Sequence, residues 1–222
     1  MFARESLAEY AAHPLFRTVG IDRSFYGPLG EDELARYAAQ LPAGFRCTMK
    51  VWSALTARVL EGRFGQAARP GFNPHFLDVD RFAEAVAGPV AAAFRAQLGA
   101  FVLEVPPAQG PVNPGGFADA VDRFLGAAPP GFRYAFELRD PRLLTARYVA
   151  VLRAHGASHV YNYWTRMRAR FVGIFAMFSS LARFLPGRSP AARGSATTSA
   201  TGFSPSRKAC ITAQRCSHSE RR

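Results

Sequence analysis

The segment Arg133-Tyr-Ala-Phe-Glu-Leu-Arg139 decides the fold class of this 222-residue chain. Bulky apolar side chains at positions 134, 136 and 138 alternate with small or charged ones, and a period of two indicates a β-strand. The flanking residues have helical spacing instead, with one apolar stripe on each side of the strand: Phe117, Val121, Phe124 and Leu125 before it, then Leu144, Tyr148, Val151 and Leu152. Helices on both sides of a strand predict successive βα units.

The same alternation of strand and helix extends toward both ends of the chain. Residues rich in β-branched and aromatic side chains predict five strands in all: Thr18–Ser24, Arg46–Trp52, Phe101–Val105, Arg133–Arg139 and Ser158–Trp164. Helices are expected at 31–41 and at 78–98, the second interrupted near Gly88-Pro89, and the connection over 53–77 is expected to be a long loop. No Asn-Gly turn joins two strands, so we expect an α/β fold, a partial TIM-like (β/α) barrel with about five parallel strands.

Each predicted strand carries a polar residue in its C-terminal half that must point to the inside of the barrel. Helices cover the outer face of such a barrel, so the bulky apolar residues face outward and the charged residues face inward. The inward set is Asp22, Lys50, Glu104, Glu137, Arg139 and Asn162. Because barrel active sites lie at the C-terminal ends of the strands, this set predicts a polar site there.

The residue types suggest acid–base chemistry on a small polar or anionic substrate. Lys50, Glu104, Glu137 and Arg139 are the candidate catalytic residues, with a glutamate as general acid or base and the two cations stabilising negative charge. Asp22, Tyr26 and Asn162 are candidate substrate-binding residues. An oxygen-ligated Mg²⁺ or Mn²⁺ on Asp22, Glu104 and Glu137 is an open alternative, and so is a purely structural network of ion pairs.

The C-terminal quarter has a different composition. Residues 1–168 hold 19 basic and 15 acidic residues, whereas residues 169–222 hold 9 basic and 1 acidic. We therefore divide the chain into a barrel domain over 1–168 and a basic, low-complexity tail over 169–222 that we expect to be disordered or read from a shifted frame. The tail, with Arg58, Arg63 and Arg69 of the long connection, leaves nucleic-acid association open as a second function.

Several classes of protein find no support in the sequence. It has no apolar stretch long enough to cross a membrane and no apolar core in the first residues to act as a signal peptide, so we expect a cytoplasmic protein without membrane contact. Three cysteines are too few for a disulfide framework. No phosphate-binding, dinucleotide-binding or serine-hydrolase motif is present. The sequence leaves the oligomeric state open.

Five motifs together resemble the YecE-like family of barrel proteins, which is a domain of unknown function. They are Ile21-Asp-Arg-Ser-Phe-Tyr26, Gly44-Phe-Arg-Cys-Thr-Met-Lys50 with Ala54-Leu-Thr56, Asn73-Pro74, Val105-Pro-Pro107 and Ala135-Phe-Glu-Leu-Arg-Asp-Pro141. The resemblance implies a TIM-like barrel of which this chain lacks the first strand and the last ones. It departs from the family at Asp22 and Glu104, where Asn and Gln are usual. By fold analogy a hydrolase or isomerase is expected, with a non-functional fragment as the remaining alternative.

Overall fold

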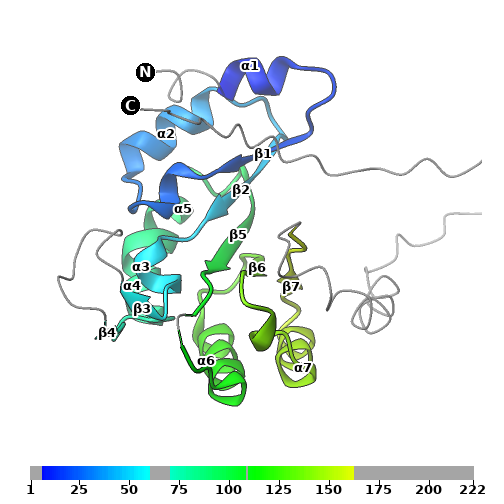
Figure 1. Ribbon diagram of the computed structural model, residues 1–222. Helices are drawn as coiled ribbons and strands as arrows, with labels where there is room; N and C mark the ends of the chain where they lie inside the picture. The colour runs from blue at the N-terminus through cyan, green and yellow to red at the C-terminus, as the bar shows by residue number, and fades with distance from the viewer. Residues whose placement is uncertain (1–6, 61–70, 109, 163–222) are drawn as a thin grey trace, which may run out of the picture.

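The computed structural model describes residues 7–60, 71–108 and 110–162 of the chain. Its centre is a five-stranded sheet in the order β1-β2-β5-β6-β7, and every neighbouring pair in it is parallel. The strands are β1 (Thr18–Ile21), β2 (Arg46–Lys50), β5 (Leu98–Val105), β6 (Tyr134–Leu138) and β7 (Ser158–His159). Figure 1 shows the helices following the strands along the chain. The predicted α/β class and the five parallel strands of a partial barrel are confirmed.

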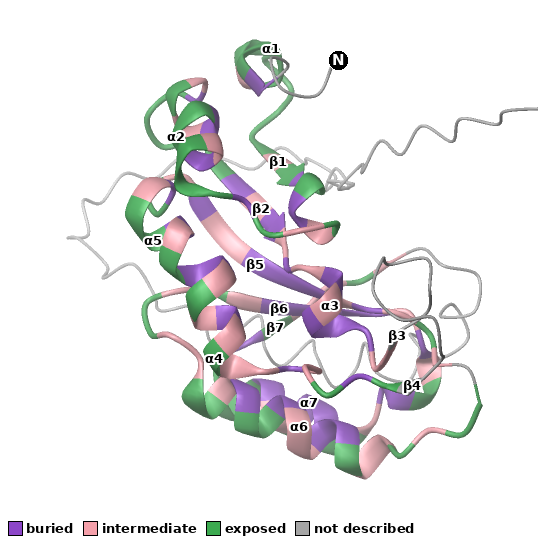
Figure 2. Cartoon of the chain, turned by 90° about the vertical axis from the view of Figure 1, so that its left-hand side faces the viewer, coloured by how far each residue is buried: buried purple, intermediate pink, exposed green. Residues whose placement is uncertain are grey.

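Helices cover one face of this sheet (Figure 2). They are α2 (Glu31–Ala39), α4 (Val79–Phe82), α5 (Gly88–Ala93), α6 (Pro114–Ala127) and α7 (Ala146–Ala154), and α1 (Leu7–Ala12) precedes β1. Thr145 caps α7 by accepting a hydrogen bond from the backbone N–H of Tyr148. One apolar core fills the space between helices and sheet.

The alternation along each strand explains this core. Cys47, Met49 and Val51 of the second strand segment are at most 1% exposed, whereas Thr48 and Lys50 between them are only partly buried. The outward residues of β5 and β6 are also fully buried: Leu103, Val105, Phe136 and Leu138. Glu104 between the first two is partly buried, whereas Ala135 and Glu137 of β6 are buried at 6% and 7% exposure. The predicted inward and outward faces of these three strands are therefore confirmed.

Several predicted boundaries are wrong, including those of β2, which ends at Lys50, and of β5, which begins at Leu98. The first strand ends at Ile21, and a 3₁₀ helix over Arg23–Phe25 follows it. Strand β7 has only two residues, and Tyr161 beyond it is 45% exposed instead of covered by a helix. The helix expected over 78–98 ends at Ala93. The interruption expected near Gly88-Pro89 is confirmed: a π-helical turn over Ala83–Ala87 directly precedes Gly88, and Pro89 has no N–H to donate to the preceding turn.

The long connection after β2 was expected to be a loop, and its described parts have regular structure. Helix α3 (Ser53–Thr56) is followed by an antiparallel pair, β3 (Val59–Leu60) with β4 (Gly71–Phe72). The buried Asn73 side chain donates to the carbonyls of Ala54 and Ala57 at 2.6 and 2.8 Å, which satisfies the C-terminal end of α3. These side-chain hydrogen bonds tie the segment after β4 to the end of α3.

The remaining predictions on chain organisation lie outside the described residues. These are the tail over 169–222 and the arginines at 63 and 69. The boundary at residue 168 therefore stays a prediction. In the part of the chain that the structure describes, no helix is both long and apolar enough to cross a membrane.

Candidate functional site

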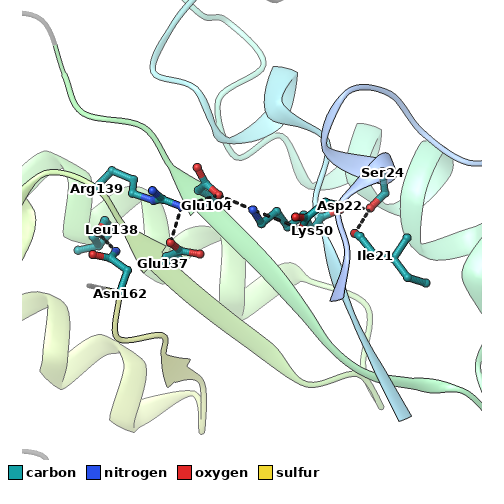
Figure 3. Close-up of polar contacts among 9 residues, drawn as sticks. All are labelled: Ile21, Asp22, Ser24, Lys50, Glu104, Glu137, Leu138, Arg139 and Asn162. Carbon is teal, nitrogen blue, oxygen red and sulfur yellow. Dashed lines mark hydrogen bonds and ion pairs between the residues drawn. The ribbon is translucent and has the colours of Figure 1, made fainter. Parts of the chain in front are cut away.

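Five charged side chains form a continuous row of ion pairs across four strands (Figure 3). Lys50 Nζ lies 3.3 Å from Asp22 Oδ1 and 2.9 Å from Glu104 Oε2. Arg139 Nη2 lies 3.2 Å from the same Glu104 oxygen and 2.8 Å from Glu137 Oε1. Acid and base alternate along this charged row, which runs in the order Asp22, Lys50, Glu104, Arg139, Glu137. The predicted convergence of these residues is therefore present in the structure.

The strand register explains why these side chains meet. Glu104 and Glu137 are direct partners in the β5–β6 ladder, and Ile21 is paired with Met49, so Asp22 and Lys50 are the next positions along β1 and β2. Lys50 is the last residue of β2, and Arg139 is the first after β6. Carboxyl ends of parallel strands share one edge of a sheet, so this placement brings the row to that edge.

The two ends of the row differ in burial, and the three side chains between them are intermediate. The Asp22 side chain is 57% exposed, Lys50 20% and Glu137 only 9%. Burial raises the pKa of Glu137 above its ordinary value, against the opposing charge of Arg139. Burial also disfavours the charge on Lys50, but hydrogen bonds and charges from Glu104 and Asp22 outweigh it and raise the pKa of that ammonium group. The row thus has a carboxyl that gains a proton readily at its buried end and a lasting cation nearer the solvent.

The segment after β1 contacts both the backbone and the side chain of Lys50. The buried Ser24 hydroxyl lies 2.6 Å from the Lys50 carbonyl oxygen, to which it donates, and 3.0 Å from that of Ile21. The Phe25 ring centroid lies 5.7 Å from Lys50 Nζ, a cation–π contact. Ser24 thereby connects the C-terminal ends of β1 and β2 next to the charged row.

The other two predicted substrate-binding residues lie beside the row rather than in it. Tyr26 is 73% exposed, and its ring packs edge-on against Phe25 at 5.5 Å. Asn162 donates from Nδ2 to the Leu138 carbonyl oxygen at 2.8 Å, so it fastens the segment after β7 to the end of β6. The structure therefore gives Asn162 a structural contact, and its role toward a substrate stays a prediction.

Sequence reasoning missed the residues that fix the loops around the row. Asp140 is 2% exposed and accepts hydrogen bonds from the Ala108 N–H at 3.1 Å and from Arg142 at its backbone N–H, Nε and Nη2. Arg142 also donates to the carbonyls of Ala108 and Gly110, both at 2.9 Å. An aspartate directly before Pro141 is a helix-capping signal, which could have drawn attention to Asp140.

This loop clamp, which we define as Asp140 with Arg142, connects the segments that follow β5 and β6. Burial alone would raise the pKa of Asp140, but the hydrogen bonds and charge of Arg142 with the Ala108 N–H outweigh it and hold that pKa below its ordinary value. Arg139, which is directly before Asp140, also donates its backbone N–H to the Val105 carbonyl at 3.0 Å. The clamp thus steadies the backbone that carries Arg139.

The predicted metal ligands are separated by cations in this arrangement. Lys50 lies between Asp22 and Glu104, and Arg139 lies between Glu104 and Glu137. Over residues 7–60, 71–108 and 110–162, no three acidic, histidine or cysteine side chains are gathered closely enough to hold an ion. The donor set of the row as it stands therefore suits internal pairing, and binding of Mg²⁺ or Mn²⁺ would require Lys50 or Arg139 to move.

Comparisons with known proteins identify the family and support the fold. No curated protein matches this chain. Two crystal structures of a DUF72 family protein from Enterococcus faecalis V583, at 2.52 and 3.10 Å resolution, match it at 19% sequence identity, with TM-scores of 0.50 and 0.51. Each match covers 69% of this chain and 57% or 52% of the other, so the chain spans little more than half the length of the solved relatives. A family model described as "Protein of unknown function DUF72" matches residues 2–200, and the chain therefore belongs to the DUF72 family.

Proposed function

We propose that the charged row is an active site for proton transfer to or from a small polar substrate, with Glu137 as the general acid or base. The observation that carries the proposal is the state of Glu137: a carboxyl only 9% exposed, with a raised pKa, at 2.8 Å from Arg139. A carboxyl of this kind exchanges a proton nearer to neutral pH than an exposed glutamate does. Perturbed carboxyls at the strand ends of such folds are typical of catalytic groups.

The other members of the row have roles that follow from their contacts. Lys50 and Arg139 are positioned to stabilise negative charge that develops on a substrate oxygen. Glu104 contacts both cations and reduces their mutual repulsion, and Asp22 at the exposed end meets the solvent. Tyr26 and Asn162 flank the two ends and would orient the substrate. General acid–base catalysis of this kind contributes about 10²- to 10⁴-fold to a rate.

The proposal also includes a reaction class, hydrolysis or isomerisation, and membership of the YecE-like group. Hydrolysis and isomerisation both require a proton donor and a stabilised oxyanion, and the row offers both. The five sequence motifs support placing the chain among the YecE-like members of the DUF72 family. A cytoplasmic location belongs to the proposal. A divalent metal would join the site only if Lys50 or Arg139 moved out of the row, which is tested by repeating each assay with Mg²⁺, with Mn²⁺ and with a chelator.

An NMR screen with the full chain tests the proposal. Panels of small esters, amides, glycosides, sugars and hydroxy acids are incubated in D₂O, where isomerisation appears as loss of a C–H signal and hydrolysis as new product signals. Glu137→Gln should reduce any turnover at least 100-fold, whereas Glu84→Gln, the same change on an exposed helical position, should leave it unchanged. Turnover that survives Glu137→Gln would contradict the assignment.

A further inference from the structure

We infer that the charged row selects a small neutral molecule with neighbouring hydroxyl groups, such as a polyol or sugar, and discriminates against anions. The inference rests on the proposed function and names the substrate class for that site. Two observations carry it: the net charge of the row, and the fact that each of its two cations already contacts two carboxylates.

The cations of the row are already neutralised by carboxylates. Lys50 lies within 3.3 Å of Asp22 and Glu104, and Arg139 lies within 3.2 Å of Glu104 and Glu137. Three acids and two bases give the row one surplus negative charge when Glu137 is ionised and a balanced charge when it is protonated. An incoming phosphate or carboxylate would therefore compete with groups that are covalently fixed in place, without a surplus of positive charge to attract it.

Hydroxyl groups suit an alternating row better than ions do. A hydroxyl donates one hydrogen bond and accepts others, so one hydroxyl can donate to a carboxylate while its neighbour accepts from Lys50 or Arg139. Such a ligand bridges adjacent members of the row and adds no charge to a partly buried site. A metal cation would need three gathered donors, which the described residues do not provide.

Phe25 and Tyr26, the two aromatic residues next to Lys50, would provide an apolar contact for the same ligand. The Phe25 ring is 5.7 Å from Lys50 Nζ, and Tyr26 packs against Phe25 and is 73% exposed. An exposed ring beside hydrogen-bonding groups offers an apolar surface to the C–H face of a sugar ring and, from the tyrosine, one further hydroxyl. Neither feature would serve a small inorganic anion.

Binding measurements with the full chain test the substrate class. Sorbitol and glucose, inorganic phosphate and putrescine are titrated separately into the ¹⁵N-labelled full chain, with the chemical-shift changes of the backbone amides as the readout. We expect the polyols to bind at least about tenfold more tightly than phosphate, which is roughly 1.4 kcal/mol and therefore a lower bound for the repulsion by one charge near a protein surface. Phosphate or putrescine binding more tightly than the polyols would overturn the inference but leave a binding site at the row, and so the proposed function, in place.

Two neutralising variants provide the internal control. Glu104→Gln and Glu137→Gln each free one or both cations, and each should raise phosphate affinity about tenfold. Glu84→Gln, which removes the same charge from an exposed helix, should not change it. Equal phosphate affinity in wild type and the three variants would overturn the inference. If one row variant folds poorly, the other is still compared with wild type and with Glu84→Gln. Polyol binding that the row variants do not weaken would overturn it as well.

Discussion

Glu104 and Glu137 are directly opposite each other on adjacent strands, and one nitrogen of Arg139 contacts both carboxylates. Like charges at directly opposed positions destabilise a sheet unless a cation lies between them. Arg139 is therefore the central member of the row, and its removal is the most informative single change.

Replacing Arg139 by Met should lower the free energy of unfolding by roughly 3 kcal/mol, because two partly buried carboxylates lose their shared partner. It should also raise the pKa of Glu137 further, since the Arg139 charge holds that pKa down. Chemical denaturation and carboxyl NMR titration measure the two effects.

Adding Glu137→Gln to the Arg139→Met protein should restore part of the stability. Arg147→Met, which breaks the exposed pair with Asp119, should cost at most about 1 kcal/mol, and an equal cost for both arginines would contradict the prediction.

The raised pKa of Glu137 predicts a specific pH dependence of stability. A folded-state pKa above the ordinary value of 4.5 means that the folded protein binds this proton more tightly than the unfolded chain. The resulting stability is present below the unfolded pKa and is lost as pH rises through the folded one. Thermal melts between pH 4 and 8 should therefore show that wild type loses stability relative to Glu137→Gln as pH rises. A difference in melting temperature that is constant with pH would rule this out.

The loop clamp should be essential for local order. Asp140→Asn removes a buried carboxylate that accepts four hydrogen bonds, and we expect a loss of about 3 kcal/mol at pH 7. Because the pKa of Asp140 is lowered, its stabilising contribution is present above the ordinary value of 3.8 and is lost as pH falls through the folded pKa. Hydrogen exchange should show faster exchange at the Ala108 amide. Asp119→Asn, at a half-exposed position on α6, is the control. Unchanged Ala108 protection in Asp140→Asn would refute the role.

His159 should be neutral in the folded protein at physiological pH. Burial lowers its pKa from 6.5 to about 4, and its Nδ1 lies 3.1 Å from the Tyr148 hydroxyl under helix α7. Since the unfolded chain takes up this proton first, its stabilising contribution is lost as pH falls from about 6.5 to about 4. Titration of the ring Cε1–H resonance should show no protonation above about pH 5, and a midpoint near 6.5 would show that the ring is not desolvated.

Periodicity alone was enough to predict the fold class, the inward faces of the strands and the members of the charged row. A strand alternates with period two wherever it is placed, so the outward burial of Met49 and Phe136 and the inward direction of Lys50 and Glu137 are local consequences of sequence. Strand ends were harder to predict, as in β7, because termination depends on which neighbour supplies hydrogen bonds.

Only the tertiary structure decided which acid pairs with which base. The register of β5 against β6 places Glu104 opposite Glu137, and nothing in either segment alone specifies that register. The clamp of Asp140 and Arg142 likewise joins residues 32 positions apart in the chain. Such pairings, and the pKa shifts that follow from them, arise from packing between elements. Periodicity in the sequence predicts the face of the strand on which a residue lies. Which residue it meets on the next strand depends on how the elements pack.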